Sequence, residues 1–249
     1  MEFEKWNNQE DYGSLMDWFR VKACEPGSYE KYREGVEEAF SDFGNVFGLD
    51  RGISFVVAET DIDFLEGKYE EVPDWAYSQG FSADPEWHDV ENPSVFVMAN
   101  DNYKYWRDLL KFVTAHELAH QKFYENHEVE WRIYQRMMFE GHSMHSAEKV
   151  AEEKGYNWVN HDHEPGKIDK EELITELDKF NTWTGENEEE TSSLFVPGGE
   201  KWKNAEGYPI AFQITEDILE RIECDISDLL DMSFEDWRKE TEKSIKRMC

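Results

Sequence analysis

The sequence predicts an α+β fold with a small N-terminal sheet, flanking helices and a mainly helical C-terminal part. Short β-branched and aromatic runs occur in the first hundred residues, and helical periodicity dominates from about Lys104 onward. A third observation is a pair of histidines spaced four residues apart within one of the later helices. We therefore expect one domain over residues 1–249, with an α/β part at about 1–103 and a helical, metal-binding part at about 104–249.

One helix and two strands are expected in the N-terminal part. Apolar residues recur at helical spacing from Ser28 to Gly48, and Gly48 is a suitable stop. The runs Ile53–Ala58 and Ser94–Met98 follow turn residues and predict strands. The acidic segment between them, at about 60–92, is expected to be irregular. The apolar positions of the expected helix are Tyr29, Tyr32, Val36, Phe40, Phe43 and Phe47.

Composition excludes several classes of function. Acidic residues outnumber basic ones by 57 to 26, so the formal net charge of the 249 residues is −31. This charge argues against binding to nucleic acid or to an anionic membrane surface, since both are negatively charged. No stretch approaches the ~20 apolar residues of a membrane helix, and the first residues lack the apolar core of a secretory signal. Three widely spaced cysteines without a CxxC pair fit a reducing compartment, so we expect a cytoplasmic protein.

The most informative motif is HExxH, in the segment KFVTAHELAHQKFY at residues 111–124. Histidines at i and i+4 lie one above the other on a helix face, so His116 and His120 can share one metal ion. In this pattern two neutral imidazoles bind Zn²⁺, and the adjacent glutamate, here Glu117, takes a proton from an activated water. His116 and His120 also share a stripe with apolar residues, which favours a buried site over a solvated helix face.

A zinc site of this kind needs a third protein ligand, and two residues are candidates. His127 follows His120 by seven residues, which resembles the downstream histidine of SprT-like metalloproteases. Glu140 follows His120 by twenty residues, on the next expected helix, which resembles the gluzincins, the thermolysin-like clan of zinc peptidases.

The periodicity of the second helix favours Glu140 over His127. Glu140 lies in the middle of an apolar stripe, where an unpaired carboxylate is costly, so we expect a cation such as zinc beside it. Gly141 weakens the helix by about 1 kcal/mol relative to alanine, which suggests that two helices approach closely there. In an antiparallel pair, Glu140 and His120 must be similarly far from a turn near residues 125–132, and His127 then falls in that turn. The stripe comprises Ile133, Met137, Met144, Ala147 and Ala151.

With Glu140 included, the sequence resembles a gluzincin, and more narrowly an uncharacterised bacterial and archaeal family of predicted zinc-dependent proteases. The resemblance covers most of the chain from about Ile53. It depends on an edge-type strand, the HExxH helix, a Glu-Gly helix, a tryptophan after a helix end, and a late helix that opens with Gly-Tyr. These segments are SVFVMAND from Ser94, TAHELAH from Thr114, FEGHSMHSAEKV from Phe139, Tyr156-Asn157-Trp158, and AEGYPIAFQITEDIL from Ala205.

The resemblance implies a zinc-dependent peptidase with His116, His120 and Glu140 as metal ligands and Glu117 as general base and then proton donor to the leaving amine. It implies that Tyr208, at the start of the late helix, stabilises the oxyanion. The histidines at 142, 145, 161 and 163 are other possibilities for that role. His161-Asp162-His163 could hold a second metal, although we favour a polar loop there. The strand at 94–98 is expected to pair with an extended substrate.

Three alternatives stay open at this point. The chain could be a SprT-like protease with His127 as the third ligand, although the net charge of −31 opposes one that acts on DNA-bound proteins. It could be a non-catalytic binding protein stabilised by zinc, or an acidic helical protein without a metal. For the peptidase we expect a peptide or protein substrate, and neither nucleic acid nor membrane as a partner.

Overall fold

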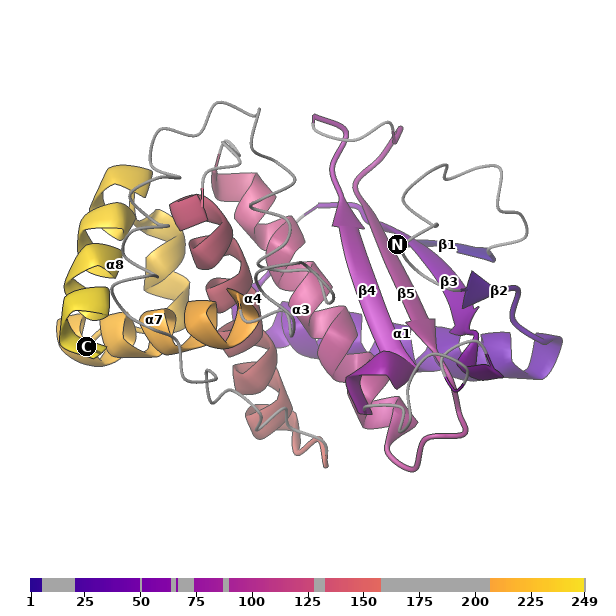
Figure 1. The fold of residues 1–249 in the computed structure, drawn as a ribbon. Coiled ribbons are helices and arrows are strands. Elements are labelled where there is room, and N and C mark those ends of the chain that lie inside the picture. Colours follow the sequence, from indigo (N-terminus) through magenta and orange to yellow (C-terminus); the bar gives the residue numbers. More distant parts are fainter. Residues whose placement is uncertain are drawn as a thin grey trace. The chain divides into compact units, whose positions relative to one another are not determined.

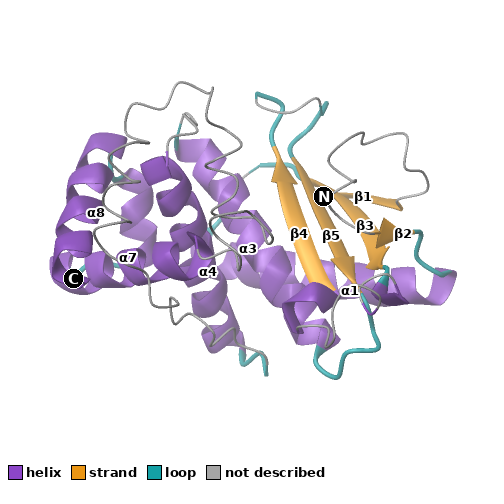
Figure 2. Ribbon diagram, in the orientation of Figure 1, coloured by secondary structure: helices purple, strands orange, loops and turns teal. Residues whose placement is uncertain are grey.

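The computed structural model of the chain describes residues 1–5, 21–49, 51–63, 66, 74–86, 90–127, 133–157 and 207–248. A small mixed sheet and several long helices confirm the predicted α+β class (Figure 2). The chain divides into two compact units, one of Met1–Lys122 with Ala147–Val159 and the other of Phe123–Ser146 with Asn160–Cys249. None of the described helices has the length and apolar character required to cross a membrane.

The sheet belongs to the first unit and has the order β1-β3-β5-β4 (Figure 1). Strand β3 (Ser54–Thr60) is parallel to β1 (Glu2–Lys5) and to β5 (Ser94–Ala99). Strand β4 (Ser78–Ala83) is antiparallel to β5, and the two-residue β2 (Val21–Lys22) pairs with the end of β3. The sheet is therefore mixed, with two parallel pairs and an antiparallel strand at one side.

Two sequence expectations for this sheet were wrong. The segment at about 60–92 is not irregular throughout, because it contains the short 3₁₀ helix η2 (Asp74–Tyr77) followed directly by β4. The strand at 94–98 is not an edge strand, because β5 lies between β3 and β4. Both errors have one cause: the β4 sequence SQGFSA has no β-branched residue, so strand propensity did not reveal it.

Helix α1 (Pro26–Phe47) confirms the first predicted helix. It ends at Gly48, whose φ of 66° lies in the left-handed region that favours glycine, and whose N–H bonds to the carbonyl of Gly44 at 3.1 Å. The side chains of α1 and of the first four turns of α3 (Trp106–Asn126) pack on one face of the sheet, together with the last turns of α4 (Ile133–Lys154). This packing forms the main core of the first unit.

The two faces of the sheet alternate, as expected of strands covered on both sides. Phe55, Val57, Val95 and Val97 face the helices, whereas their neighbours Val56, Ala58, Phe96 and Met98 form a smaller cluster. Cys24 lies in the helix-side core at 3% exposure, and its thiol donates a long hydrogen bond of 3.8 Å to the carbonyl of Val57.

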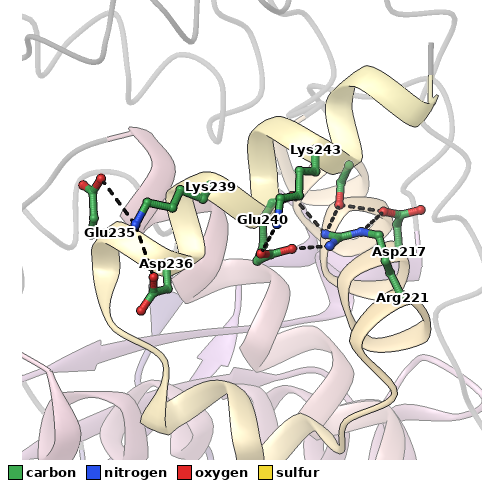
Figure 3. A network of polar contacts seen from close by, with 8 residues as sticks. Asp217, Arg221, Glu235, Asp236, Lys239, Glu240 and Lys243 are labelled. Atoms are coloured by element: carbon green, nitrogen blue, oxygen red, sulfur yellow. Dashed lines mark hydrogen bonds and ion pairs between the residues drawn. The ribbon is translucent and has the colours of Figure 1, made fainter.

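The second unit is helical where it is described. It contains the remaining parts of α3 and α4, followed by α7 (Gly207–Ile222), the 3₁₀ helix η3 (Ile226–Asp231) and α8 (Phe234–Met248). A polar network joins α7 to α8 (Figure 3): Arg221 of α7 pairs with Asp217 on its own helix and with Glu240 of α8. Ser244 of α8 donates a 2.6 Å hydrogen bond to Asp217, which closes the network.

Candidate metal centre

The HExxH motif lies in the middle of α3, as the sequence predicted. The imidazole rings of His116 and His120 are perpendicular, with centroids 4.5 Å apart, as expected for residues one helical turn apart on the same face. His120 and Glu117 are buried at 4% and 6% exposure, whereas His116 is half-buried. The motif therefore lies on a largely covered face of its helix.

Hydrogen bonds between side chains and backbone carbonyls join this stretch of α3 to the sheet. The hydroxyl of Ser82 on β4 donates a 2.7 Å hydrogen bond to the carbonyl of Glu117. The amide nitrogen of Gln121 donates to the carbonyls of Ala83 and Ser94, at 3.0 and 3.1 Å. Because these bonds involve main-chain atoms of β4, β5 and α3, they position the helix backbone along the strand.

Gly80 on β4 leaves the space that the Glu117 side chain occupies. A Cβ atom at position 80 would lie 2.5 Å from Cγ and 2.9 Å from Oε1 of Glu117, and 2.9 Å from Val113 Cγ1. Any larger residue at this position must displace the glutamate. Glycine at position 80 of β4 is therefore required for the observed position of the Glu117 side chain.

Glu140 lies on α4 and is 1% exposed, as its place in an apolar stripe predicted. One of its carboxylate oxygens forms a 2.7 Å ion pair with Arg136, one turn earlier on the same helix. The expected cation beside the buried carboxylate is therefore already present as an arginine, so burial alone does not argue for a metal. The sequence carried the signal for this pair, because arginine and glutamate at i and i+4 are neighbours on a helix.

Arg136 also contacts Tyr208, the second residue of α7. Partial burial tends to lower the pKa of Arg136, but the Glu140 carboxylate, the phenols of Tyr208 and Tyr124, and a hydrogen bond with Tyr208 raise it above its usual value. The guanidinium lies 5.6 Å from the centroid of the Phe139 ring. Tyr208 is thus linked to Glu140 through a cation that remains charged.

Gly141 lies at a close approach of two helices, as the sequence suggested, and the neighbouring helix is α7. A Cβ atom at position 141 would lie 2.1 Å from the Thr215 hydroxyl oxygen and 2.5 Å from the carbonyl oxygen of Ala211. Since one of these atoms belongs to the backbone of α7, no side-chain rotation could make room. The glycine beside Glu140 therefore sets the distance between α4 and α7.

Among the described residues, His116, His120 and Glu140 form a group whose ligand atoms all lie within 4.8 Å of one another. Two imidazoles and one carboxylate are the donor set of many catalytic zinc sites, which leave a fourth position for water. The three residues therefore fit the metal that the sequence predicted.

His127 does not belong to this group. It follows the last residue of α3, and its ring stacks on Phe123 with centroids 4.4 Å apart. Burial lowers the pKa of His127, while a hydrogen bond with the backbone of Leu230 and the charge of Asp231 oppose that shift. Its surroundings are those of a packed aromatic side chain at a helix end.

The other histidines considered from the sequence have varied positions. His142 is buried, 3.5 Å from the Ser146 hydroxyl, and His145 stacks on Phe212 and lies 3.0 Å from its carbonyl oxygen. His161, Asp162 and His163 lie outside the described residues, as do Trp158 and the acidic run at 185–193.

Comparisons of the chain with models of protein families, with curated proteins and with solved structures find no match. The resemblance to gluzincins remains a prediction from the motifs. The group of His116, His120 and Glu140 supplies the chemical basis on which a function can be proposed.

Proposed function

We propose that this protein is a zinc-dependent peptidase with His116, His120 and Glu140 as metal ligands. The observation that carries the proposal is the group of these three side chains, with Glu117 on the same helix as the two histidines. A catalytic zinc site requires three ligands and a general base, and these four residues are the types that such sites use. Zinc, when bound, supplies a Lewis acid that activates water near neutral pH.

Glu117 is the proposed general base. It takes a proton from the attacking water and then donates it to the leaving amine, so that one carboxylate serves both steps. Its burial at 6% exposure and the contact with Gly80 limit the positions that its side chain can adopt. Restricting the base in this way favours proton transfer, because a misplaced catalytic group loses much of its effect.

Tyr208 is the proposed donor to the oxyanion that forms on the peptide carbonyl. Its phenol interacts with Arg136, the cation that pairs with Glu140, and a phenol is a suitable donor to an oxyanion. The pairing of an extended substrate with the sheet was expected at residues 94–98. Since β5 has neighbours on both sides, we assign this pairing to β4.

The first experiment measures bound zinc per chain and peptide hydrolysis in the wild type and in Glu117→Gln. We expect about one zinc in both proteins, and a loss of hydrolysis in Glu117→Gln on the order of 10²- to 10⁴-fold, because glutamine cannot accept the proton. Elemental analysis after mild dialysis and a peptide-library assay provide the two readouts. An active Glu117→Gln protein would contradict the mechanism.

Ligand variants test the metal assignment separately. Glu140→Ala is expected to lose zinc, whereas His127→Ala should retain it and serves as the matched control. The opposite result would favour the SprT-like alternative. Full zinc in the wild type without turnover of any peptide would favour a binding protein stabilised by zinc.

A further inference from the structure

Arg136 is a basic residue in direct contact with a proposed metal ligand, and none of the roles proposed above uses it. Its guanidinium lies 2.7 Å from a carboxylate oxygen of Glu140, and it also contacts Tyr208 and Phe139. Two opposite effects on a metal are conceivable. A cation beside the carboxylate could compete with zinc, or it could orient the carboxylate for zinc.

The geometry favours orientation. A carboxylate has two oxygens and about four acceptor positions, so it can contact an arginine and a metal at the same time. Arginine is planar and presents several donors in fixed directions, which restricts rotation of the partner carboxylate. We propose that Arg136 is a positioning residue that holds the Glu140 carboxylate in its metal-binding orientation. This inference rests on the proposed metal centre.

Arg136 is itself held in place from more than one side. The Tyr208 phenol at the start of α7 forms a hydrogen bond with its side chain, and the Phe139 ring lies 5.6 Å from its guanidinium carbon. Phe139 in turn packs edge-on against Phe123 near the end of α3, with centroids 5.3 Å apart. Residues of α3, α4 and α7 thus contribute to the orientation of one guanidinium, which makes it a rigid support.

Charge compensation supports the same role. Glu140 is 1% exposed, and burying a carboxylate without a partner is costly. The 2.7 Å ion pair with Arg136 supplies that partner and favours one position of the carboxylate. Hydrogen-bond partners of metal ligands commonly change metal affinity by 10- to 100-fold when they are removed.

The test measures zinc affinity by competition with a chelating indicator, well below the unfolding temperature of each protein. Arg136→Met is expected to weaken zinc binding by about 10- to 100-fold. Arg136→Lys, which retains the charge but not the planar set of donors, should bind with intermediate affinity and covers the case in which Arg136→Met fails to fold.

The chain offers a matched control in Arg238 of α8. Arg238 pairs with Glu242 at the same i and i+4 spacing, and its side chain is 28% exposed, against 27% for Arg136. The difference lies in the carboxylates, because Glu242 is 39% exposed and Glu140 only 1%. Arg238→Met should bind zinc within twofold of the wild type.

The outcomes separate this inference from the proposed function. Unchanged or tighter zinc binding by both Arg136 variants overturns the positioning role, even if their melting temperatures fall, and leaves the peptidase proposal standing. Weaker zinc binding by Arg136→Met supports the positioning role. If the wild-type protein also hydrolyses no peptide, the positioning role stands and the peptidase proposal is contradicted. A wild type that binds no zinc overturns both.

Discussion

The surroundings of Glu117 and Glu140 differ in what fixes each carboxylate. Glu117 lies over a strand, where Gly80 leaves space for its side chain and backbone acceptors anchor its helix. Glu140 is held by charged and aromatic side chains, and the glycine that follows it leaves space for the backbone of a second helix. One glycine therefore accommodates a side chain that can move, and the other accommodates main-chain atoms that cannot. Added bulk should affect catalysis at the first position and folding at the second.

The largest effect on stability is expected from Gly141→Ala. The new methyl group would lie 2.5 Å from the Ala211 carbonyl oxygen, so α4 and α7 must separate. We expect a loss of about 3 kcal/mol in the free energy of unfolding, at the upper end of the range for overpacked cores. Urea unfolding of the wild type and of Gly141→Ala measures this difference in the free energy of unfolding.

Gly44→Ala provides the control for Gly141→Ala. Gly44 is an exposed glycine in α1 with no atom within 4 Å of the added methyl group. Alanine there should leave stability unchanged or raise it by up to about 1 kcal/mol, because alanine is the better helix former. If Gly141→Ala were as stable as Gly44→Ala, the close approach of α4 and α7 would be refuted.

Gly80→Ala should separate activity from stability. Its methyl group would meet the side chains of Glu117 and Val113, which can shift, so the loss in the free energy of unfolding should be about 1 kcal/mol, at the lower end of the range for overpacked cores. Displacement of the general base by about 1 Å should lower kcat on the order of 10- to 100-fold. Bound zinc should stay at the wild-type level. Full activity in this variant would show that Glu117 does not need its observed position.

The smallest effect is expected on the pH dependence of the free energy of unfolding, through the protonation of His127. Burial holds the pKa of His127 below its ordinary value, so the unfolded chain binds more protons than the folded chain just below about pH 6.5. The stability that neutral His127 contributes is present above that pH and is lost as the pH falls. Unfolding of the metal-free protein should therefore depend less on pH between 7.5 and 5.5 in His127→Gln than in the wild type. An equal dependence in both proteins would contradict the burial of this imidazole.

Periodicity predicted the elements that carry strong patterns. Helices α1, α3 and α4 and strands β3 and β5 lie where the periodicity indicated, and α7 begins at Gly207, as the motif resemblance implied. The break between α3 and α4 also falls at the expected turn, because α3 ends at Asn126 and α4 begins at Ile133. Each of these elements has a long apolar stripe or a β-branched run bounded by glycine or proline.

Features that depend on contacts distant in sequence were missed. Strand β4 has few strand-forming residues, and its pairing with β5 was not visible from its own composition. The role of Gly80 depends on a helix about forty residues later, which no local pattern reveals. Arg136 was different: its position four residues before Glu140 was visible in the sequence, and an arginine at that spacing can be the cation that a buried carboxylate needs.

The cysteines offer a way to observe the two units separately. Cys24 is buried in the core of the first unit, whereas Cys224 follows α7 in the second and is half-buried, and burial raises the pKa of its thiol. A thiol reagent reacts with the exposed thiolate, so Cys24 is labelled only when its surroundings open, whereas the half-buried Cys224 reacts faster as its surroundings open further. In a Cys249→Ser background, the two labelling rates report local opening in the two units separately. Added zinc should lower the labelling rate of a cysteine only if metal binding stabilises the unit in which that cysteine lies.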